Sequence, residues 1–152
     1  MKVAIVSDHR GVDIKKALYE YLIGKNIDAI DLSPENHPTD DYPDFVYRVG
    51  KAIQDKSADL GILVCRSGIG MSIAANKMKG IYCGRVTSKR DIVLTCHDNG
   101  INVVSLSMED VDLEEAKEIV DIFLTEERLN DERHVRRFKK VLAIEDGSYN
   151  EL

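Results

Sequence analysis

The 152-residue sequence predicts an α/β fold: a doubly wound, Rossmann-like parallel sheet of five strands with helices on both faces. The length is that of one domain, and a composition of 43% hydrophobic and 32% charged residues is ordinary for a globular protein. Short apolar runs alternate along the chain with helical patterns, which implies parallel pairing through right-handed crossovers. We therefore expect residues 1–152 to form a single domain.

Five short runs carry the strand signal, because each is rich in Val, Ile or Leu and is bounded by glycine or polar residues. They are Val3–Val6, Ile27–Leu32, Leu60–Val64, Ile81–Val86 and Asn102–Leu106. The third has the clearest character of a buried strand. The polar segment 33–41, which contains two prolines, predicts a loop after the second strand.

Helical patterns fill the segments between these strands and continue to the end of the chain. The expected helices are Val12–Gly24, Pro43–Asp55, Gly68–Lys77, Asp91–Cys96, Leu113–Leu124 and Arg133–Ile144. The first has apolar residues at helical spacing and ends on Gly24, and the second opens on Pro43, which suits a first helical turn. The third follows a glycine-containing turn, the fifth is amphipathic, and the last is basic.

Composition and charge exclude several classes of protein. A net charge of −6 and a pI near 5.2 argue against nucleic acid as a partner. The longest apolar stretches have about five residues, whereas a membrane-spanning helix needs about 20. No secretory signal is visible at the N-terminus. We therefore expect a cytoplasmic protein without a membrane partner.

The three cysteines do not indicate a disulfide framework or a zinc site. Cys65, Cys83 and Cys96 are odd in number and widely spaced, and no C-x-x-C motif occurs. No hydride-cofactor motif and no metal cluster is apparent, so we expect neither a metal nor a cofactor. We interpret Cys83 and Cys96 as packing residues.

Asp8 and His9 follow the first predicted strand, at the sheet edge where doubly wound folds bind ligands. This pair of side chains can share acid–base and hydrogen-bonding work. In the alternative, Asp8 caps the next helix and His9 is a surface residue. The dipeptide alone favours the alternative.

The third predicted strand leads into Cys65 and a turn that contains Gly68 and Gly70. Free backbone N–H groups at such a turn bind phosphate or an oxyanion. Cys65 lies where this positive end is expected to lower the thiol pKa and make it reactive. In the alternative, Cys65 is a small buried apolar residue. The glycine spacing matches neither common nucleotide-binding pattern.

Arg133 and Arg137 are four residues apart and share one face of the last predicted helix. Two guanidinium groups on one face suit a phosphate dianion, although a solvated basic face is the commoner reason for such a pattern. Together with the cysteine turn and the Asp–His pair, they fit a small phosphorylated substrate. The simplest matching reaction is a cofactor-free proton transfer beside a carbonyl.

These motifs resemble type B ribose-5-phosphate isomerases, a family that also includes galactose-6-phosphate isomerase subunits. The resemblance covers nearly the whole chain, and its most specific part runs from Cys65 to Lys77. The matching residues are Ser7–His9, Asp41–Asp44, Gly61–Lys77, Asn99, Asn102–Val103, Arg133–His134 and Arg137. The cysteine motif resembles the ribose-phosphate branch.

The resemblance implies interconversion of ribose 5-phosphate and ribulose 5-phosphate through an enediolate, in the non-oxidative pentose phosphate pathway. Cys65 would move the proton between C2 and C1, and Ser67, usually Thr in the family, would shuttle protons on the oxygens. Backbone N–H groups of residues 66–70 would hold the enediolate. The residues implied to bind substrate are Asp8, His9, Tyr42, Arg66, Gly68, Ile69, Gly70, Asn99, Arg133, His134 and Arg137. The last helix would pack on a partner, in a homodimer or a dimer of dimers with shared active sites.

Three positions depart from the family pattern. Arg66 replaces a glycine beside the cysteine, and Glu109 replaces a phosphate-binding arginine. Asp98 stands where the family has its ring-opening histidine, with His97 one residue earlier, so either is a candidate for that step. These changes keep two alternatives open: an isomerase of a six-carbon aldose phosphate, and a sugar-phosphate-binding protein without catalysis.

Overall fold

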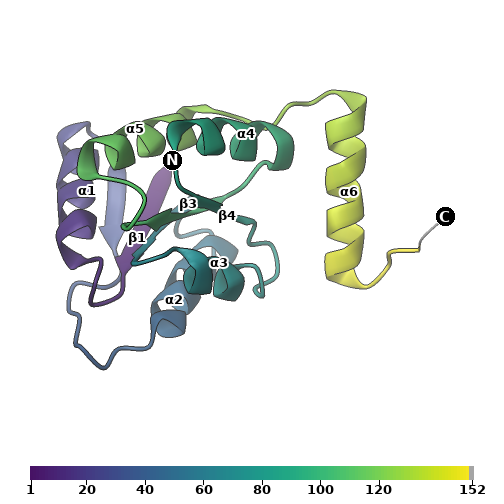
Figure 1. Cartoon of the computed structure of the whole chain (residues 1–152). Coiled ribbons are helices and arrows are strands. Elements are labelled where there is room, and N and C mark those ends of the chain that lie inside the picture. The colour runs from purple at the N-terminus through teal and green to yellow at the C-terminus, as the bar shows by residue number, and fades with distance from the viewer. Residues whose placement is uncertain (151–152) are drawn as a thin grey trace.

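The computed structural model describes residues 1–150 and contains the expected parallel sheet (Figure 1). The five strands pair in the order β2-β1-β3-β5-β4, and every pair is parallel. Their bounds are β1 Lys2–Ser7, β2 Asp28–Asp31, β3 Leu60–Cys65, β4 Cys83–Val86 and β5 Val103–Ser107. The predicted fold class is therefore confirmed.

Helices cover both faces of the sheet (Figure 1). The helices α1 (Val12–Gly24), α4 (Lys89–Asn99) and α5 (Leu113–Thr125) pack on one face, while α2 (Tyr42–Gln54) and α3 (Ile69–Ala75) pack on the other. Side chains of β3 alternate between the two cores. Ile62 and Val64 enter the first, and Leu63 and Cys65 enter the second. The alternation of β3 thus directs Cys65 towards α2 and α3.

The last helix, α6 (Glu132–Asp146), stands apart from these layers (Figure 1). It is held to the body by an edge-to-face contact between Tyr82 and Phe138, with ring centroids 5.0 Å apart, and by Glu145, which accepts hydrogen bonds from Gly80 and Tyr82. Val141 and Ile144 remain exposed on it. Within residues 1–150, no helix combines the length and apolar character needed to cross a membrane.

The largest boundary difference concerns α4, which was expected over Asp91–Cys96 but extends to Asn99. It begins two residues earlier than predicted, at Lys89, because the Ser88 hydroxyl accepts a hydrogen bond from Asp91 N at 3.2 Å, as an N-cap residue does. Its end lies at Gly100, which has a φ of 61°, a left-handed conformation that glycine adopts without strain. The extension keeps residues 97–99 inside the last helical turn.

The other boundaries differ from the predicted ones by one or two residues at an end, and some elements are longer while others are shorter. The predicted strand over 81–86 begins only at Cys83, because Ile81 N donates back to Met78 O and closes a turn. The predicted strand over 27–32 is Asp28–Asp31, and the helix predicted over 68–77 is α3.

Candidate active site

The carboxyl ends of β1 and β3 bring Asp8 and Cys65 close together. These strands are neighbours in the sheet, and Asp8 N donates a hydrogen bond to Val64 O at 3.3 Å. The helix α1 approaches the same point, since a Cβ on Gly11 would lie 2.6 Å from Val64 O. The tight packing fixes the Asp8 segment against the end of β3.

The Cys65 thiol is buried and receives a hydrogen bond from the turn that follows it. Gly68 N lies 3.1 Å from Cys65 Sγ, and Gly68 O accepts a hydrogen bond from Ser105 Oγ at 2.8 Å. Gly68 has a φ of 71°, so the turn needs a residue that tolerates the left-handed region. The turn therefore directs at least one backbone N–H at the sulfur.

The expected lowering of the Cys65 pKa does not occur. Burial raises the pKa of the thiol, and this effect exceeds the lowering by the hydrogen bond from Gly68 N. The negative charge of Asp8 raises the pKa further, because it disfavours a nearby thiolate. The glycine turn lies where it was expected and directs Gly68 N at the sulfur, but burial in the α2/α3 core has the larger effect on the pKa of Cys65.

The capping role that the alternative gave to Asp8 is confirmed, and the acid–base role of the Asp8–His9 pair stays a prediction. Asp8 Oδ1 accepts hydrogen bonds from Arg10 N at 2.9 Å and Gly11 N at 3.1 Å, so it does cap the turn into α1. His9 Nδ1 is buried and has no hydrogen-bond partner among residues 1–150. An unpaired buried ring nitrogen at this edge is available to a ligand.

Tyr42 borders the same turn from α2. A Cβ on Gly70 would lie 2.7 Å from Tyr42 Cζ, so the phenol ring lies directly against Gly70. Tyr42 is 40% exposed, and Ile69 in the turn is 51% exposed. The surface between the turn and the start of α2 is thus open, as the lining of a substrate site must be.

Arg66 turns outward from the turn and forms an ion pair with Glu109. Glu109 N also donates to Arg66 O at 3.1 Å, so backbone and side chains join the same two residues. Two of the three departures from the family pattern are therefore paired: the cation at 66 neutralises the carboxylate at 109. The sequence suggested that Arg66 compensates for Glu109 but did not predict a direct ion pair between these residues, which are 43 positions apart.

Arg85 is a residue that the sequence reasoning missed. Its Nε donates to Ser67 O at 2.6 Å, and its guanidinium pairs with Asp110 at 2.7 Å. Ser67 Oγ lies 3.4 Å from Ile69 N. Arg85 thus holds the Cys65 turn from the direction of β4, although nothing in its local sequence marks it.

A second cluster of predicted residues lines a cavity of about 440 Å³ between α4, the start of β4 and α6. Asp98, Asn99 and Arg137 lie along it, together with Cys83 and Phe138. Arg133 lies one turn before Arg137 and is 62% exposed. This cavity joins a carboxylate, an amide and an arginine helix face.

The structure separates the two candidates at residues 97 and 98. His97 Nε2 pairs with Glu126, the residue that follows α5, and does not line the cavity. Asp98 lines the cavity and has Oδ1 3.3 Å from Nε2 of His134. Successive helical residues point about 100° apart. Because α4 extends over residues 97 and 98, their side chains point in different directions and cannot both line the cavity.

His134 was expected to assist phosphate binding, but its side chain is only 2% exposed. Its Nδ1 lies 2.6 Å from Oδ2 of Asp131, the N-cap residue of α6. Desolvation raises the pKa of Asp131, but the hydrogen bonds from His134 lower it by more. The pKa of Asp131 is therefore below its usual range. Both ring nitrogens of His134 therefore face carboxylates.

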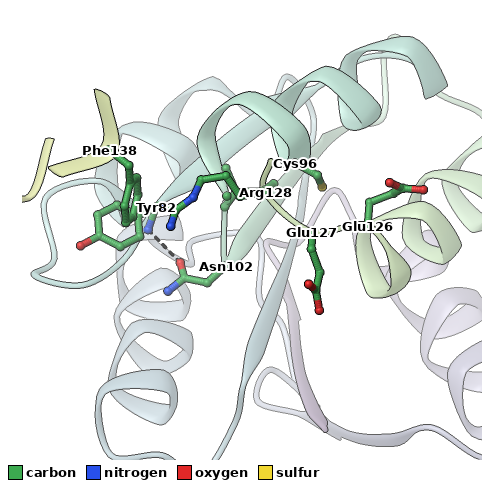
Figure 2. Close-up of a pocket in the computed structure, with 9 residues that line it drawn as sticks. Tyr82, Cys96, Asn102, Glu126, Glu127, Arg128 and Phe138 are labelled. Atoms are coloured by element: carbon green, nitrogen blue, oxygen red, sulfur yellow. Dashed lines mark hydrogen bonds between the residues drawn. The ribbon is translucent and has the colours of Figure 1, made fainter. Parts of the chain in front are cut away.

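Figure 2 shows an adjacent cavity of about 400 Å³ that contains none of the predicted site residues. In it the Arg128 guanidinium stacks 4.0 Å from the Phe138 ring, and Tyr82 N donates to the Asn102 side chain at 2.8 Å. The Tyr82–Phe138 contact attaches α6 to the body of the fold here, and Leu129 N, which donates to His97 O at 2.9 Å, attaches the segment before α6. We interpret this cavity as part of that attachment.

The two clusters lie at opposite ends of the parallel strands. Asp8 and Cys65 lie at the carboxyl ends of β1 and β3. Asp98 and Asn99 end α4, which runs back from the carboxyl end of β4 towards the start of β5 at Val103. One chain therefore does not bring all the predicted residues into one cavity. No group of three or more His, Cys, Asp or Glu within residues 1–150 is arranged to hold a metal ion.

Comparison with known proteins decides the family. A family model described as Ribose/Galactose Isomerase matches residues 3–141. The chain belongs to the ribose/galactose isomerase family. Among curated relatives, the probable ribose-5-phosphate isomerase B of Mycoplasma genitalium is 38% identical over 145 residues, covering 94% of this chain and 95% of the relative. The Escherichia coli ribose-5-phosphate isomerase B is 33% identical, covering 95% and 96%.

Solved structures of the ribose/galactose isomerase family agree with this assignment. A ribose-5-phosphate isomerase B from Clostridium thermocellum superposes with a TM-score of 0.91 at 34% identity, covering 98% of this chain and all of that one. The Mycoplasma genitalium enzyme, solved with bound ribulose-5-phosphate, gives 0.88 at 37% identity and covers 95% and 96%. The family resemblance drawn from the motifs is confirmed.

Proposed function

We propose that this chain is an aldose–ketose isomerase that interconverts ribose 5-phosphate and ribulose 5-phosphate through an enediolate. The observation that carries the proposal is the buried Cys65 thiol, which receives the Gly68 N–H at the carboxyl end of β3. The family and the printed activities of its relatives support the substrate. We expect a cytoplasmic enzyme.

The proton transfer uses groups that the Cys65 turn supplies. The Cys65 thiolate takes the C2 proton of the open-chain aldose, and the C–H electron pair forms the C1=C2 bond while the carbonyl pair moves onto O1. The thiol then returns the proton to C1, and the O2 proton passes to O1 with the help of Ser67. Backbone N–H groups around Gly68 stabilise the oxyanion. The reaction is internal to the sugar, so no cofactor is a reactant.

A second copy of the chain completes the site in this proposal. Near Cys65, no arginine pair suited to a phosphate lies among the described residues. Arg133 and Arg137 lie with Asp98 towards the opposite end of the parallel strands. A homodimer, or a dimer of dimers, with a twofold axis places each cluster against the partner's other cluster. The exposed Val141 and Ile144 of α6 are suited to that contact.

The test is direct. Purified protein is incubated with ribose 5-phosphate, without added metal or cofactor, and ribulose 5-phosphate is followed with time. Steady formation supports the proposal. Tight calorimetric binding without turnover would indicate a sugar-phosphate-binding protein, and faster turnover of a six-carbon aldose phosphate would reassign the substrate.

The raised pKa of Cys65 predicts how this activity depends on pH. Only the thiolate accepts the C2 proton, and burial raises the pKa at which it forms. We therefore expect kcat/KM for ribulose 5-phosphate, an acyclic substrate, to increase with pH between about pH 6 and 9. A flat profile measured over this range would contradict a buried thiol base.

The Arg66–Glu109 pair predicts a charge effect on substrate binding. Arg66→Gly leaves Glu109 unpaired beside the Cys65 turn, where a carboxylate repels a sugar phosphate. Half or more of each side chain is exposed, so solvent screens the charge of Glu109. We therefore expect KM to rise only about two- to five-fold. The increase should shrink at high salt.

A double variant controls for this effect. Arg66→Gly combined with Glu109→Arg removes the repulsion and should return KM to near or below the original value. If KM is the same in the single variant, the double variant and the unmodified protein, the pair does not face the substrate.

A further inference from the structure

His134 is the most buried titratable side chain near the second cluster, and each of its ring nitrogens faces a carboxylate. Nδ1 lies 2.6 Å from Asp131 Oδ2 and Nε2 lies 3.3 Å from Asp98 Oδ1. The two carboxylates differ in position. Asp131 caps α6 through the backbone N–H groups of residues 133 and 134, while Asp98 comes from α4 and lines the cavity.

The contact between His134 and Asp131 follows from the capping of α6. The contact between His134 and Asp98 has no such structural reason. Asp131 already closes the start of α6. Asp98 is 53% exposed and could point to solvent at no cost in desolvation, yet it lies against the buried ring. The imidazole therefore connects a buried position to a carboxylate that a ligand can reach.

We propose that Asp98 and His134 act as one proton-holding pair that opens the furanose ring of the substrate, with Asp98 touching the sugar and His134 as its positioning residue. The inference rests on the proposed function. Pairing with His134 gives Asp98 a source of the proton that ring opening requires. An ordinary carboxyl, with a pKa of about 3.9, is almost fully ionised at neutral pH and has no proton to give, whereas an imidazole titrates near 6.5.

Ring opening adds one proton to the ring oxygen and removes one from the C1 hydroxyl. The proton on His134 Nε2 passes to the Asp98 carboxylate, and the resulting carboxyl donates a proton to the ring oxygen. The C1–O4 bond breaks and its electron pair becomes part of the new O4 hydroxyl. A water molecule removes the proton of the C1 hydroxyl, whose O–H electron pair forms the C1=O bond. The pair ends as neutral imidazole and carboxylate, and solvent returns its proton.

Charged side chains surround the His134 ring from two helices. Asp131 faces His134 from the N-cap of α6 and Asp98 faces it from α4. Arg133 Nε lies 3.6 Å from Asp131 Oδ1, on the side away from the ring contact, and Arg137 lines the cavity beside Asp98. Two carboxylates thus flank one imidazole. Arg137 is suited to hold the phosphate of the same substrate.

Two reactions separate ring opening from the rest of catalysis. Isomerisation of ribose 5-phosphate requires the ring to open. Ribulose 5-phosphate has no furanose form, because its O5 is esterified, so exchange of its C1 hydrogen with deuterium from solvent requires only the Cys65 steps. Both are measured in the unmodified protein and in Asp98→Asn, His134→Asn and His97→Asn. The His134→Asn amide retains a donor near Nδ1 for Asp131 and has no group at Nε2.

We expect Asp98→Asn and His134→Asn to lower kcat for ribose 5-phosphate by roughly ten-fold or more, while deuterium exchange stays within about two-fold of the original rate. Asp98→His places an imidazole directly at the cavity and should remove the dependence on His134 in the double variant.

Three results would overturn the inference. Unchanged isomerisation in His134→Asn would show that Asp98 acts alone, and a larger loss in His97→Asn would reassign the step to that residue. A parallel fall of isomerisation and exchange in His134→Asn would indicate a purely structural role. The absence of both reactions in the unmodified protein would overturn the proposed function itself, which is a different result.

Discussion

Cys65→Ala is expected to lower kcat for ribose 5-phosphate roughly 10²–10⁴-fold, because it removes the group that moves the proton between C2 and C1. The thiol lies at the end of β3, in hydrogen-bond contact with Gly68 N. Removing one sulfur from this edge leaves the backbone turn intact. Ligand binding should therefore persist while turnover disappears.

The measurement is kcat with ribose 5-phosphate, together with calorimetric binding of the same sugar and a thermal melt. Cys96→Ala is the matched control, since Cys96 is also buried but lies on the opposite face of the sheet, where burial raises its pKa to about 11. It should retain turnover. Full activity in Cys65→Ala would exclude the thiol as the base, and loss of binding in that variant would point to a collapsed site.

The position of Cys65 could be predicted from the sequence because it depends on short-range patterns. An apolar run of five residues predicts a buried strand, and the strict alternation of a strand sends Ile62 and Cys65 to opposite faces. A glycine-containing turn then opens α3. Each of these features is local, so the sequence could predict the turn and the backbone N–H groups that it directs at the sulfur.

The assignment at positions 97 and 98 could not be made from the sequence, because it depends on where α4 ends. The Ser88 cap and Gly100 place the last helical turn over residues 97–99 and send His97 to Glu126 and Asp98 to the cavity. Contacts between distant segments were equally inaccessible. Arg66 and Glu109 neutralise each other across 43 positions, and no local pattern announces the pairing.

The net pKa of Cys65 illustrates a competition that sequence motifs cannot weigh. The turn supplies the hydrogen bond from Gly68 N, which lowers the pKa, and the sequence shows that turn. Burial by the α2/α3 core raises the pKa by more, and its extent depends on packing from several elements. Motifs therefore indicate the candidate base, whereas its protonation depends on the assembled fold.

Mixing two inactive variants is expected to restore activity if two chains share each site. Cys65→Ala disables the cluster at the carboxyl edge of the sheet, and Arg137→Gln disables the cavity beside α6. In a mixed dimer, the intact Cys65 of one chain meets the intact Arg137 of the other, so one of the two sites is unmodified. Half of the randomly paired dimers are mixed, so roughly a quarter of the original activity should return.

The control uses two changes within one cluster. Cys65→Ala mixed with Asp8→Asn leaves no unmodified site in any dimer, because both residues belong to the carboxyl edge of the same chain, so activity should not return. Arg136→Gln is matched to Arg137→Gln, since Arg136 is exposed on the same helix and pairs only with Glu132 among residues 1–150. It should keep its activity alone. If co-expressed Cys65→Ala and Arg137→Gln show only the sum of their separate activities, while the two chains demonstrably associate, each chain builds its own site and the shared arrangement is wrong.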